Sequence, residues 1–372
     1  MFHSMNYLLS YSFRDSDGNA ISSMNEDIPI MPASNMKIIS GYAIYKLLGK
    51  NHELETIFSI HGDTLIISGG PMPLFSQKDL ISISDVIGKV GRKINRLVFT
   101  DKVLDTKRYA PGWSIDDKRF CYQSGISTFS LSEGCYIKGG EQIQTPDSCH
   151  SDGTLAHSDQ IQNLGKSLWK LAGGDGRPSI HRKDMEKGKI LVTHRETVGD
   201  ILDHIEEVSC NFSTEVMTKY LSYSIQKRRG NWNDSIKIIM KFLGELGLDI
   251  SGINIADGSG LSRLNAVPTR FLSQLIHQII HSGDNDFIDY LPYPGKGTLK
   301  NRLSELSQFE VRAKTGSLYG VSTLSGYVKK LGISFSIAVN NYTDAGKPAS
   351  EIVDQLLINT VTKIHENSTQ IP

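Results

Sequence analysis

The sequence lacks several features that would define a function class at once. It has no run of about 18 apolar residues, so we expect no transmembrane segment. Lysine plus arginine and aspartate plus glutamate number 40 each. Without an excess of one charge, the chain has no overall field to attract nucleic acid or an anionic membrane, and we expect no nucleic-acid partner.

Motifs for metals and cofactors are also missing. The 11 histidines form no H-E-x-x-H pattern, and no P-loop or dinucleotide fingerprint is present, so we expect neither a metal nor a cofactor. The cysteines lack the spacing of a ligand set; they are Cys121, Cys135, Cys149 and Cys210. Because a chain of 372 residues can bury a sufficient core without disulfide bonds, we expect free thiols.

The first residues, MFHSMNYLLSYSFRDSDG, contain no basic segment followed by an apolar one. The sequence therefore shows no signal peptide, and as it stands it predicts a cytoplasmic protein. If a leader has been removed, an extracytoplasmic location is expected instead.

The length of 372 residues favours two domains, at about 150 residues each. Alternating apolar residues predict strands over 7–13, from 21 onwards, and over 310–318, 323–329 and 333–340. Helical spacing predicts helices over 34–48, 197–205 and 212–225. These elements indicate an α/β (α+β) fold, in which both ends of the chain form one antiparallel sheet flanked by helices.

The stretch from 52 to 188 has a different pattern, with short strands and helices in alternation. We expect an inserted α/β domain over 52–188. The remaining residues, 1–51 and 189–372, would form one discontinuous domain.

Three short motifs occur in an informative order. S-x-x-K is common by itself, since it occurs at Ser34–Lys37, Ser167–Lys170 and Ser224–Lys227. Alone, Ser34 could be a helix cap and Lys37 a surface charge. However, Ser34 opens a predicted helix, an S-x-N follows between two predicted helices at Ser209–Asn211, and the single K-T-G lies on a late strand at Lys314–Gly316. This order is the signature of penicillin-binding proteins and serine β-lactamases.

The chemistry gives each residue type a reason. At i and i+3 on a helix, the Lys37 amine can reach the Ser34 hydroxyl and take its proton, provided that the amine is neutral. Lowering a lysine pKa from about 10.4 to about 7 costs roughly 4–5 kcal/mol, and burial beside Lys314 is one source. Ser209 would relay the proton to the leaving amine, and Asn211 would bind a substrate amide.

The K-T-G strand predicts a binding edge for a peptide. Lys314 and Thr315 would face the carboxylate of the substrate, and Gly316 would let a peptide lie against the strand. The backbone N–H groups of Ser34 and Ser317 could form an oxyanion hole.

Longer segments carry a family resemblance that covers most of the chain. The sequence resembles the D-alanyl-D-alanine carboxypeptidases of the class C low-molecular-mass penicillin-binding protein type, the S13 serine peptidases. The segments are PASNMK at 32–37, GDTLIISGGPMPL at 62–74, YAPGWSIDD at 109–117, EVSCNFSTEVM at 207–217, DGSGLSRLN at 257–265, GKGTLKNRL at 295–303 and VRAKTGSLYGVSTLSGYV at 311–328.

The resemblance implies a transpeptidase/β-lactamase-like fold and a hydrolase that works through an acyl-enzyme. Ser34 would attack the D-Ala-D-Ala carbonyl, release the terminal D-amino acid, and be freed by water. β-Lactams would acylate the same serine. A D,D-endopeptidase activity on peptidoglycan cross-links is also implied as an option.

The resemblance further implies a pocket for the diamino acid of the substrate peptide. Trp113 would wall it, Asp116 would receive a side-chain ammonium, and Leu261 and Arg263 would lie alongside. An aspartate and an arginine suit a side chain with both an amine and a carboxylate. A purely structural role for the two charged residues stays open.

Two departures from the family are visible. Cys210 stands in S-x-N where the family often has aspartate, and the stretch between Ser34 and Ser209 is shorter than the usual insertion, so a third subdomain is expected to be missing.

Two other functions compete. The first is a cytoplasmic D-amino-acid-specific peptidase, amidase or esterase that has the same site but does not act on peptidoglycan. The second is a non-catalytic peptide-binding module. Binding alone would not need a neutral lysine beside a serine, which argues against the module.

Overall fold

The computed structural model describes residues 7–91, 93–137, 154–174, 176–343 and 348–369. Its helices are α1 (Met36–Leu48), α2 (Gln77–Gly88), α3 (Gln160–Leu171), α4 (Val198–Val208), α5 (Asn211–Gln226), α6 (Trp232–Glu245), α7 (Thr269–His281), α8 (Asn285–Asp289) and α9 (Ala349–Thr369). Among the described residues, no helix combines the length and apolar character that a membrane crossing requires.

The chain divides into two compact units, each made from separate segments. Unit 1 consists of Met1–Ala43, Asp203–Ser209 and Ile236–Pro372. Unit 2 consists of Ile44–Leu202 and Cys210–Ser235. The predicted domain limits, 1–51 with 189–372 and 52–188, stay a prediction.

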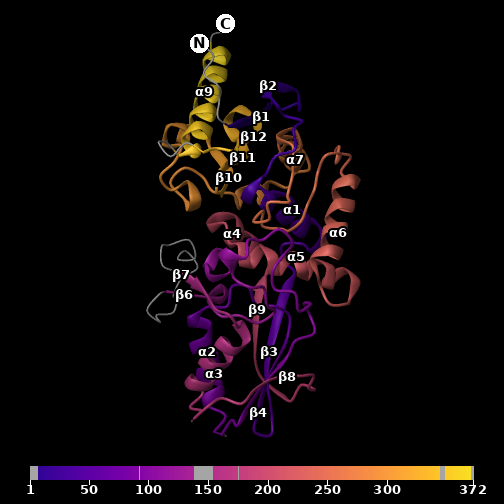
Figure 1. The fold of residues 1–372 in the computed structure, drawn as a ribbon, viewed down its shortest axis with the longest axis vertical. Coiled ribbons are helices and arrows are strands. Elements are labelled where there is room, and N and C mark those ends of the chain that lie inside the picture. Colours follow the sequence, from indigo (N-terminus) through magenta and orange to yellow (C-terminus); the bar gives the residue numbers. More distant parts are fainter. Residues whose placement is uncertain (1–6, 92, 138–153, 175, 344–347, 370–372) are drawn as a thin grey trace. The chain divides into compact units, whose positions relative to one another are not determined.

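Unit 1 is built on a five-stranded sheet in the order β10-β11-β12-β1-β2, which Figure 1 labels. All of its neighbouring strands run antiparallel. The strands are β1 (Leu8–Arg14), β2 (Ala20–Met24), β10 (Val311–Leu318), β11 (Val321–Val328) and β12 (Ile333–Asn340). The expectation of one antiparallel sheet from both chain ends, flanked by helices, is confirmed, and β10 forms one edge.

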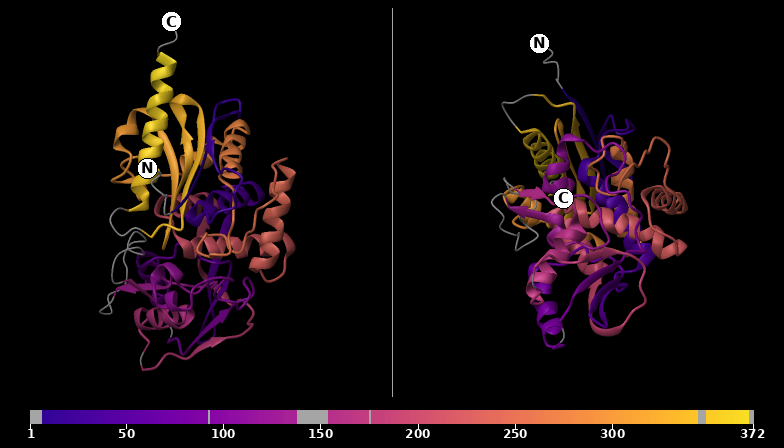
Figure 2. Two further views of the ribbon diagram at one scale, coloured as in Figure 1. Left: turned by 45° about the horizontal axis from the view of Figure 1, so that its top comes forward. Right: turned by 60° about the horizontal axis from the view of Figure 1, so that its bottom comes forward.

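The two faces of this sheet differ in chemistry because side chains alternate along each strand. Phe13, Phe335 and Ile337 are buried on the face that packs against α9, the yellow helix in Figure 2. The opposite face is polar and buried: Ser10 Oγ lies 2.7 Å from Thr269 Oγ1 on α7, and Ser273 Oγ donates to Ser12 Oγ at 2.9 Å. Hydrogen bonds therefore take part in connecting this face to α7.

Unit 2 contains a second five-stranded sheet, in the order β8-β5-β4-β3-β9. It comprises β3 (Glu53–His61), β4 (Thr64–Gly69), β5 (Arg96–Thr100), β8 (Ile180–Arg182) and β9 (Lys189–Thr197), with a small separate pair, β6 (Cys135–Ile137) and β7 (Thr154–Ala156). Strands β4, β5 and β8 are parallel, and β3 pairs antiparallel with β4 and β9. Helices α2 and α3 share one apolar cluster with this sheet.

The expectation of free thiols is wrong for two cysteines. Cys121 and Cys135 form a disulfide bond, with their Cα atoms 5.4 Å apart. The bond joins the short 3₁₀ turn Cys121–Gln123 to the start of β6, and the spacing of the cysteines in the sequence does not predict it. Cys210 is buried, and its Sγ accepts the N–H of Ser213 at 3.3 Å. Cys149 lies outside the described residues.

Candidate active site

Ser34 lies on a 3₁₀ turn, Ala33–Asn35, immediately before α1. Two hydrogen bonds fix this turn to β11: Thr323 Oγ1 donates to the Pro32 carbonyl at 2.9 Å, and Asn35 Nδ2 donates to Ser325 Oγ at 2.7 Å. Ala33 has a φ of +46°, a strained conformation for a residue with a side chain. Ser34 is therefore held in a defined place, and it remains half-exposed.

Lys37 lies one helical turn behind Ser34 and is fully buried. Its Nζ is 3.0 Å from Ser34 Oγ and donates to the Ser259 carbonyl at 2.9 Å. The carbonyl fixes the amine in the position from which it faces the hydroxyl. Because the side chain is buried, Lys37 is not the surface charge of the alternative interpretation.

The loop that carries the Ser259 carbonyl is rigid. The buried Asp257 carboxylate accepts the N–H groups of Gly260 at 2.9 Å and Ser262 at 2.6 Å, and also Asn265 Nδ2 at 2.7 Å. Gly260 has a φ of +83°, and a Cβ there would lie 1.7 Å from the Ala33 carbonyl oxygen. Only glycine allows this approach. Sequence reasoning assigned the segment to the substrate pocket and missed its contact with Lys37.

Lys314 lies on the edge strand β10 and is fully buried. Within the part of the chain that the structure describes, its Nζ has no hydrogen-bond partner. Burial lowers the pKa of Lys314 to about 7; the nearby charge of Glu206 opposes this shift, and that of Lys37 adds to it. Ser34, Lys37 and Lys314 are thus brought together in unit 1.

Gly316 follows Lys314 on the same face of β10, and its lack of a side chain has a local reason. A Cβ there would lie 2.2 Å from Thr323 Oγ1 and 3.0 Å from the backbone nitrogen of Ser34. The glycine therefore lets β10 lie directly against the turn that carries Ser34. Thr315, between Lys314 and Gly316 in the sequence, donates its Oγ1 hydrogen to Thr298 Oγ1 at 2.8 Å. Ser317, the next residue, is exposed.

Ser209 stands in the short loop between α4 and α5, with a φ of +61° and 8% exposure. The end of α4 is held by the segment that precedes β10. Lys296 Nζ pairs with Glu207 at 2.9 Å, and a Cβ on Gly297 would lie 2.5 Å from the Glu207 carbonyl oxygen. Because Thr298 contacts β10, the segment 296–298 connects the S-x-N loop to the K-T-G strand.

Glu206 is a third buried charge at this site, and sequence reasoning missed it. The side chain is fully buried, and within the described residues neither carboxylate oxygen has a hydrogen-bond partner. Burial raises the pKa of Glu206 to about 7, against the opposing charges of Lys314 and Lys37. A signal existed: helical spacing from the buried Leu202 places residue 206 on the core side of α4.

Three of the predicted site residues belong to unit 2, whereas the Ser34 group lies in unit 1. Asn211 begins α5, and its Nδ2 donates to the Tyr122 carbonyl at 2.9 Å. Trp113 is buried, with its ring centroid 6.2 Å from those of both Tyr109 and Trp232. Asp116 is exposed at the start of the turn Asp116–Arg119.

The other two predicted pocket residues belong to unit 1. Arg263 is exposed, and its guanidinium donates to the Tyr319 carbonyl at 3.3 and 3.4 Å, just beyond the end of β10. Leu261 is half-buried on the same loop. Asp116 and Arg263 are therefore supplied by different units.

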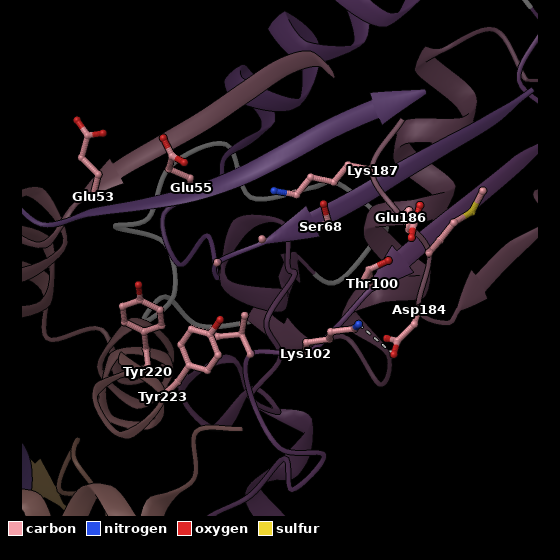
Figure 3. A pocket seen from close by; sticks show the side chains of 14 residues that line it. Glu53, Glu55, Ser68, Thr100, Lys102, Asp184, Glu186, Lys187, Tyr220 and Tyr223 are labelled. Carbon is pink, nitrogen blue, oxygen red and sulfur yellow. Dashed lines mark ion pairs between the residues drawn. The ribbon is translucent and has the colours of Figure 1, made fainter. Parts of the chain in front are cut away.

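Unit 2 also has a cavity of about 690 Å³, which Figure 3 shows from close by. Its lining includes the ion pair of Lys102 with Asp184, at 3.1 Å, and the rings of Tyr220 and Tyr223, whose centroids are 5.8 Å apart. None of the predicted catalytic or substrate-binding residues lines it. This cavity is thus no guide to the predicted chemistry of the chain.

Comparison with known families gives one description. A family model described as the D-Ala-D-Ala carboxypeptidase 3 (S13) family matches residues 14–166 and 155–360. A D-alanyl-D-alanine carboxypeptidase of Actinomadura sp. (strain R39) is 23% identical over 88% of this chain and 76% of its own length. A D-alanyl-D-alanine carboxypeptidase DacB of Haemophilus influenzae is 26% identical over 87% of this chain and 83% of its own length.

Solved structures share the fold. The crystal structure of penicillin binding protein 4 (dacB) from Haemophilus influenzae matches with a TM-score of 0.82 and 18% identity over 96% of each chain. A predatory peptidoglycan endopeptidase from Bdellovibrio bacteriovorus matches with a TM-score of 0.60 and 16% identity, over 97% of this chain and 93% of its own.

Proposed function

Because this chain belongs to the D-Ala-D-Ala carboxypeptidase 3 (S13) family, we propose that it is a serine-type hydrolase that removes the terminal D-alanine from peptides ending in D-Ala-D-Ala. One observation carries the assignment to particular residues: the fully buried Lys37 has its Nζ 3.0 Å from Ser34 Oγ. A buried amine at this distance from a half-exposed hydroxyl is the arrangement of a base and its nucleophile.

In the acylation step, Lys37 Nζ takes the Ser34 proton while Ser34 Oγ forms a bond to the carbonyl carbon of the penultimate D-alanine. The bond from that carbon to the nitrogen of the terminal D-alanine then breaks. The leaving nitrogen receives a proton through Ser209 and departs as an amine. In the second step water attacks the ester, Lys37 takes the water proton, and Ser34 Oγ leaves with a proton to restore the free enzyme.

Substrate binding uses the edge strand and its flanks. Lys314, Thr315 and Ser317 lie on β10, whose outer edge can receive an extended peptide, and the Lys314 ammonium would attract the terminal carboxylate. Asn211 would bind the substrate amide. We assign the oxyanion hole to the N–H groups of Ser34 and Ser317, and Gly316 supports this because its missing Cβ lets the two segments approach.

We assign Trp113, Asp116, Leu261 and Arg263 to recognition of the diamino acid in the peptide. The exposure of Asp116 and Arg263 supports this, since neither charge is consumed by a buried ion pair. A peptide with an amine and a carboxylate on its side chain would satisfy both residues. The same site would serve a D,D-endopeptidase reaction on a cross-link of that chemistry.

A disulfide bond bears on where this enzyme acts. Disulfide bonds form and persist mainly in oxidising compartments outside the cytoplasm. The Cys121–Cys135 bond therefore supports an extracytoplasmic enzyme that meets peptidoglycan. It argues against the alternative, a cytoplasmic peptidase, amidase or esterase with the same site.

The test is the intact mass of the protein after incubation with a penicillin. We expect one adduct on the unmodified protein and none on Ser34→Ala. Ser167→Ala is the matched control, because Ser167 belongs to another S-x-x-K pattern, and it should still be acylated. No adduct on the unmodified protein, or an adduct on Ser34→Ala, would exclude Ser34 as the nucleophile.

A second measurement addresses the peptide. D-Alanine release should be compared for D-Ala-D-Ala peptides that carry lysine and for those that carry a diamino diacid. We expect Arg263→Ala to reduce turnover of the diacid peptide more than that of the lysine peptide. Equal effects on the two would remove the proposed role of Arg263.

A further inference from the structure

Glu206 occupies a place where a carboxylate is costly. Its neighbours on the core side of α4, Leu202 and Ile205, are fully buried apolar residues, and Glu206 is fully buried with them. An unpaired carboxylate in such a position is destabilising unless nearby charges compensate it. Two buried lysines, Lys314 and Lys37, favour its charged form when they are protonated.

The space for this carboxylate comes from the helix that carries the nucleophile. A Cβ on Gly41 would lie 2.8 Å from Glu206 Oε1, so the carboxylate lies directly against the backbone of α1 at Gly41. Gly41 is one turn beyond Lys37 on the same side of α1. A glycine inside a helix costs roughly 0.5–1 kcal/mol relative to alanine, and here it makes room for a charge.

The neighbouring glutamate has a different environment. Glu207 is partly exposed and pairs with Lys296 at 2.9 Å, away from the buried lysines. Adjacent residues of one helix thus provide a carboxylate with its own cation and a carboxylate that interacts with the two active-site lysines. Within the described residues, both Glu206 oxygens and the Lys314 Nζ are buried without hydrogen bonds, so their interaction is one of charge.

We propose that Glu206 is a positioning residue of this active site, whose buried negative charge holds Lys314 as the cation that binds the carboxylate of the substrate. The proposal rests on the proposed function, because it assigns Lys314 to the substrate carboxylate. Two lysines buried side by side would otherwise both tend to lose their protons. With Glu206 present, one lysine can remain charged for binding while the other is neutral for proton transfer.

The sign of the effect follows from the charges. Glu206 raises the pKa of Lys314, against burial and the charge of Lys37, which lower it. Without the carboxylate, Lys314 would lose its proton at a lower pH. The acylation rate with a substrate that has a carboxylate should then begin to decrease at a lower pH. The rate with an ester that has no carboxylate should not depend on the protonation of Lys314.

The experiment is the pH profile of the acylation rate constant with a penicillin, which carries a carboxylate, and with p-nitrophenyl acetate, which does not. In Glu206→Gln we expect the alkaline limb for the penicillin to move down by about one pH unit, a tenfold loss on that limb. No corresponding loss on the alkaline side is expected with p-nitrophenyl acetate, because that loss reports the binding of a carboxylate by Lys314. Glu206→Asp should restore part of the shift, and Glu207→Gln should match the unmodified protein.

Gly41→Ala gives a second route that leaves the glutamate in the chain. Its new methyl group would displace the end of a flexible side chain rather than backbone, so the protein should fold. We expect the same direction of shift as in Glu206→Gln. An unchanged penicillin profile in both variants, or equal losses with the two substrates, would overturn the role of Glu206. Absence of any penicillin adduct on the unmodified protein would instead contradict the proposed function.

Discussion

Two buried lysines, one in each unit, show how differently the same side chain can be used. In unit 2, the fully buried Lys219 Nζ pairs with Asp105 at 2.5 Å, donates to the Lys107 carbonyl at 2.7 Å, and lies 4.4 Å from the centre of the Trp232 ring. In unit 1, Lys314 is equally buried, yet within the described residues its Nζ has no hydrogen-bond partner.

The difference separates a structural cation from a functional one. Every interaction that Lys219 can make is already made, so it stabilises the contacts around it and has nothing to offer a ligand. Lys314 keeps its donors available and is compensated only by the charge of Glu206. A buried charge without hydrogen bonds is costly for stability, and such a cost is expected where a substrate will complete the site.

The largest effect that we expect is the loss of acylation when Lys314 is replaced. In Lys314→Met, we expect the rate of acylation by a penicillin to fall by about 10²–10³-fold, the range for loss of one preorganised electrostatic group. Its free energy of unfolding at or below pH 7 should change little, because Glu206, whose pKa burial raises to about 7, can take up a proton when the neighbouring cation is lost. Stopped-flow acylation and urea unfolding measure the two quantities. A destabilised variant with a normal acylation rate would make Lys314 a structural residue like Lys219.

Reduction of the disulfide bond tests unit 2 by itself. The loop closed by Cys121 and Cys135 has a sequence separation of 14, for which the chain-entropy model gives about 3 kcal/mol. We expect a Cys121→Ala/Cys135→Ala variant to lose about that much in free energy of unfolding, measured by urea denaturation. Because Ser34 and Lys37 belong to unit 1, the folded variant should still be acylated. Loss of acylation at full stability would contradict this separation.

Lys219→Met should have the opposite pattern to Lys314→Met. The variant keeps the stem that packs on Trp232 but loses the ion pair with Asp105 and the bond to the Lys107 carbonyl. Because Asp105 is partly exposed and can be hydrated, we expect a loss of about 2–3 kcal/mol in free energy of unfolding. The acylation rate of the folded fraction should be unchanged. A rate loss larger than the unfolded fraction explains would mean that Lys219 contributes to acylation and is not a purely structural cation.

The same contrast explains how much the sequence could predict. Ser34 and Lys37 are three residues apart, so their contact follows from helix geometry alone, and the strands near both chain ends have a clear alternation. The order of the three motifs was enough to group Lys314 with them. These predictions depend on local spacing or on a family pattern.

What the sequence did not predict depends on contacts between distant segments. Asp257 looked like part of a substrate loop, but its buried carboxylate organises the backbone that positions Lys37. Glu206 belongs to no motif, and the sequence analysis does not single it out. The strand β3, which lies between β4 and β9 in its sheet, was missed because its two glutamates interrupt the apolar pattern near its start. For the Asp257 loop and for Glu206, the residues of the active site that they affect, Lys37 and Lys314, lie far along the chain.

The smallest expected effect tests Glu206 through stability. Its folded-state pKa of about 7 lies above the ordinary value of 4.5, so the stability that this group contributes is fully present below about pH 4.5 and is lost as the pH rises through 7. Glutamine does not titrate. The difference in free energy of unfolding between Glu206→Gln and the unmodified protein should therefore shift in favour of the variant as the pH rises from 4.5 to 7.

The control for this measurement is Glu207→Gln, followed by urea unfolding over the same pH range. Its pair with Lys296 is partly exposed, and such pairs contribute up to about 1 kcal/mol, so removing it should destabilise the protein slightly. Changes of opposite sign in the free energy of unfolding of Glu206→Gln and Glu207→Gln would show that Glu207 stabilises the fold, whereas Glu206 lowers its stability. If both variants changed in the same direction, Glu206 would be an ordinary member of the helix, and the contrast between Lys219 and Lys314 would lose its electrostatic basis.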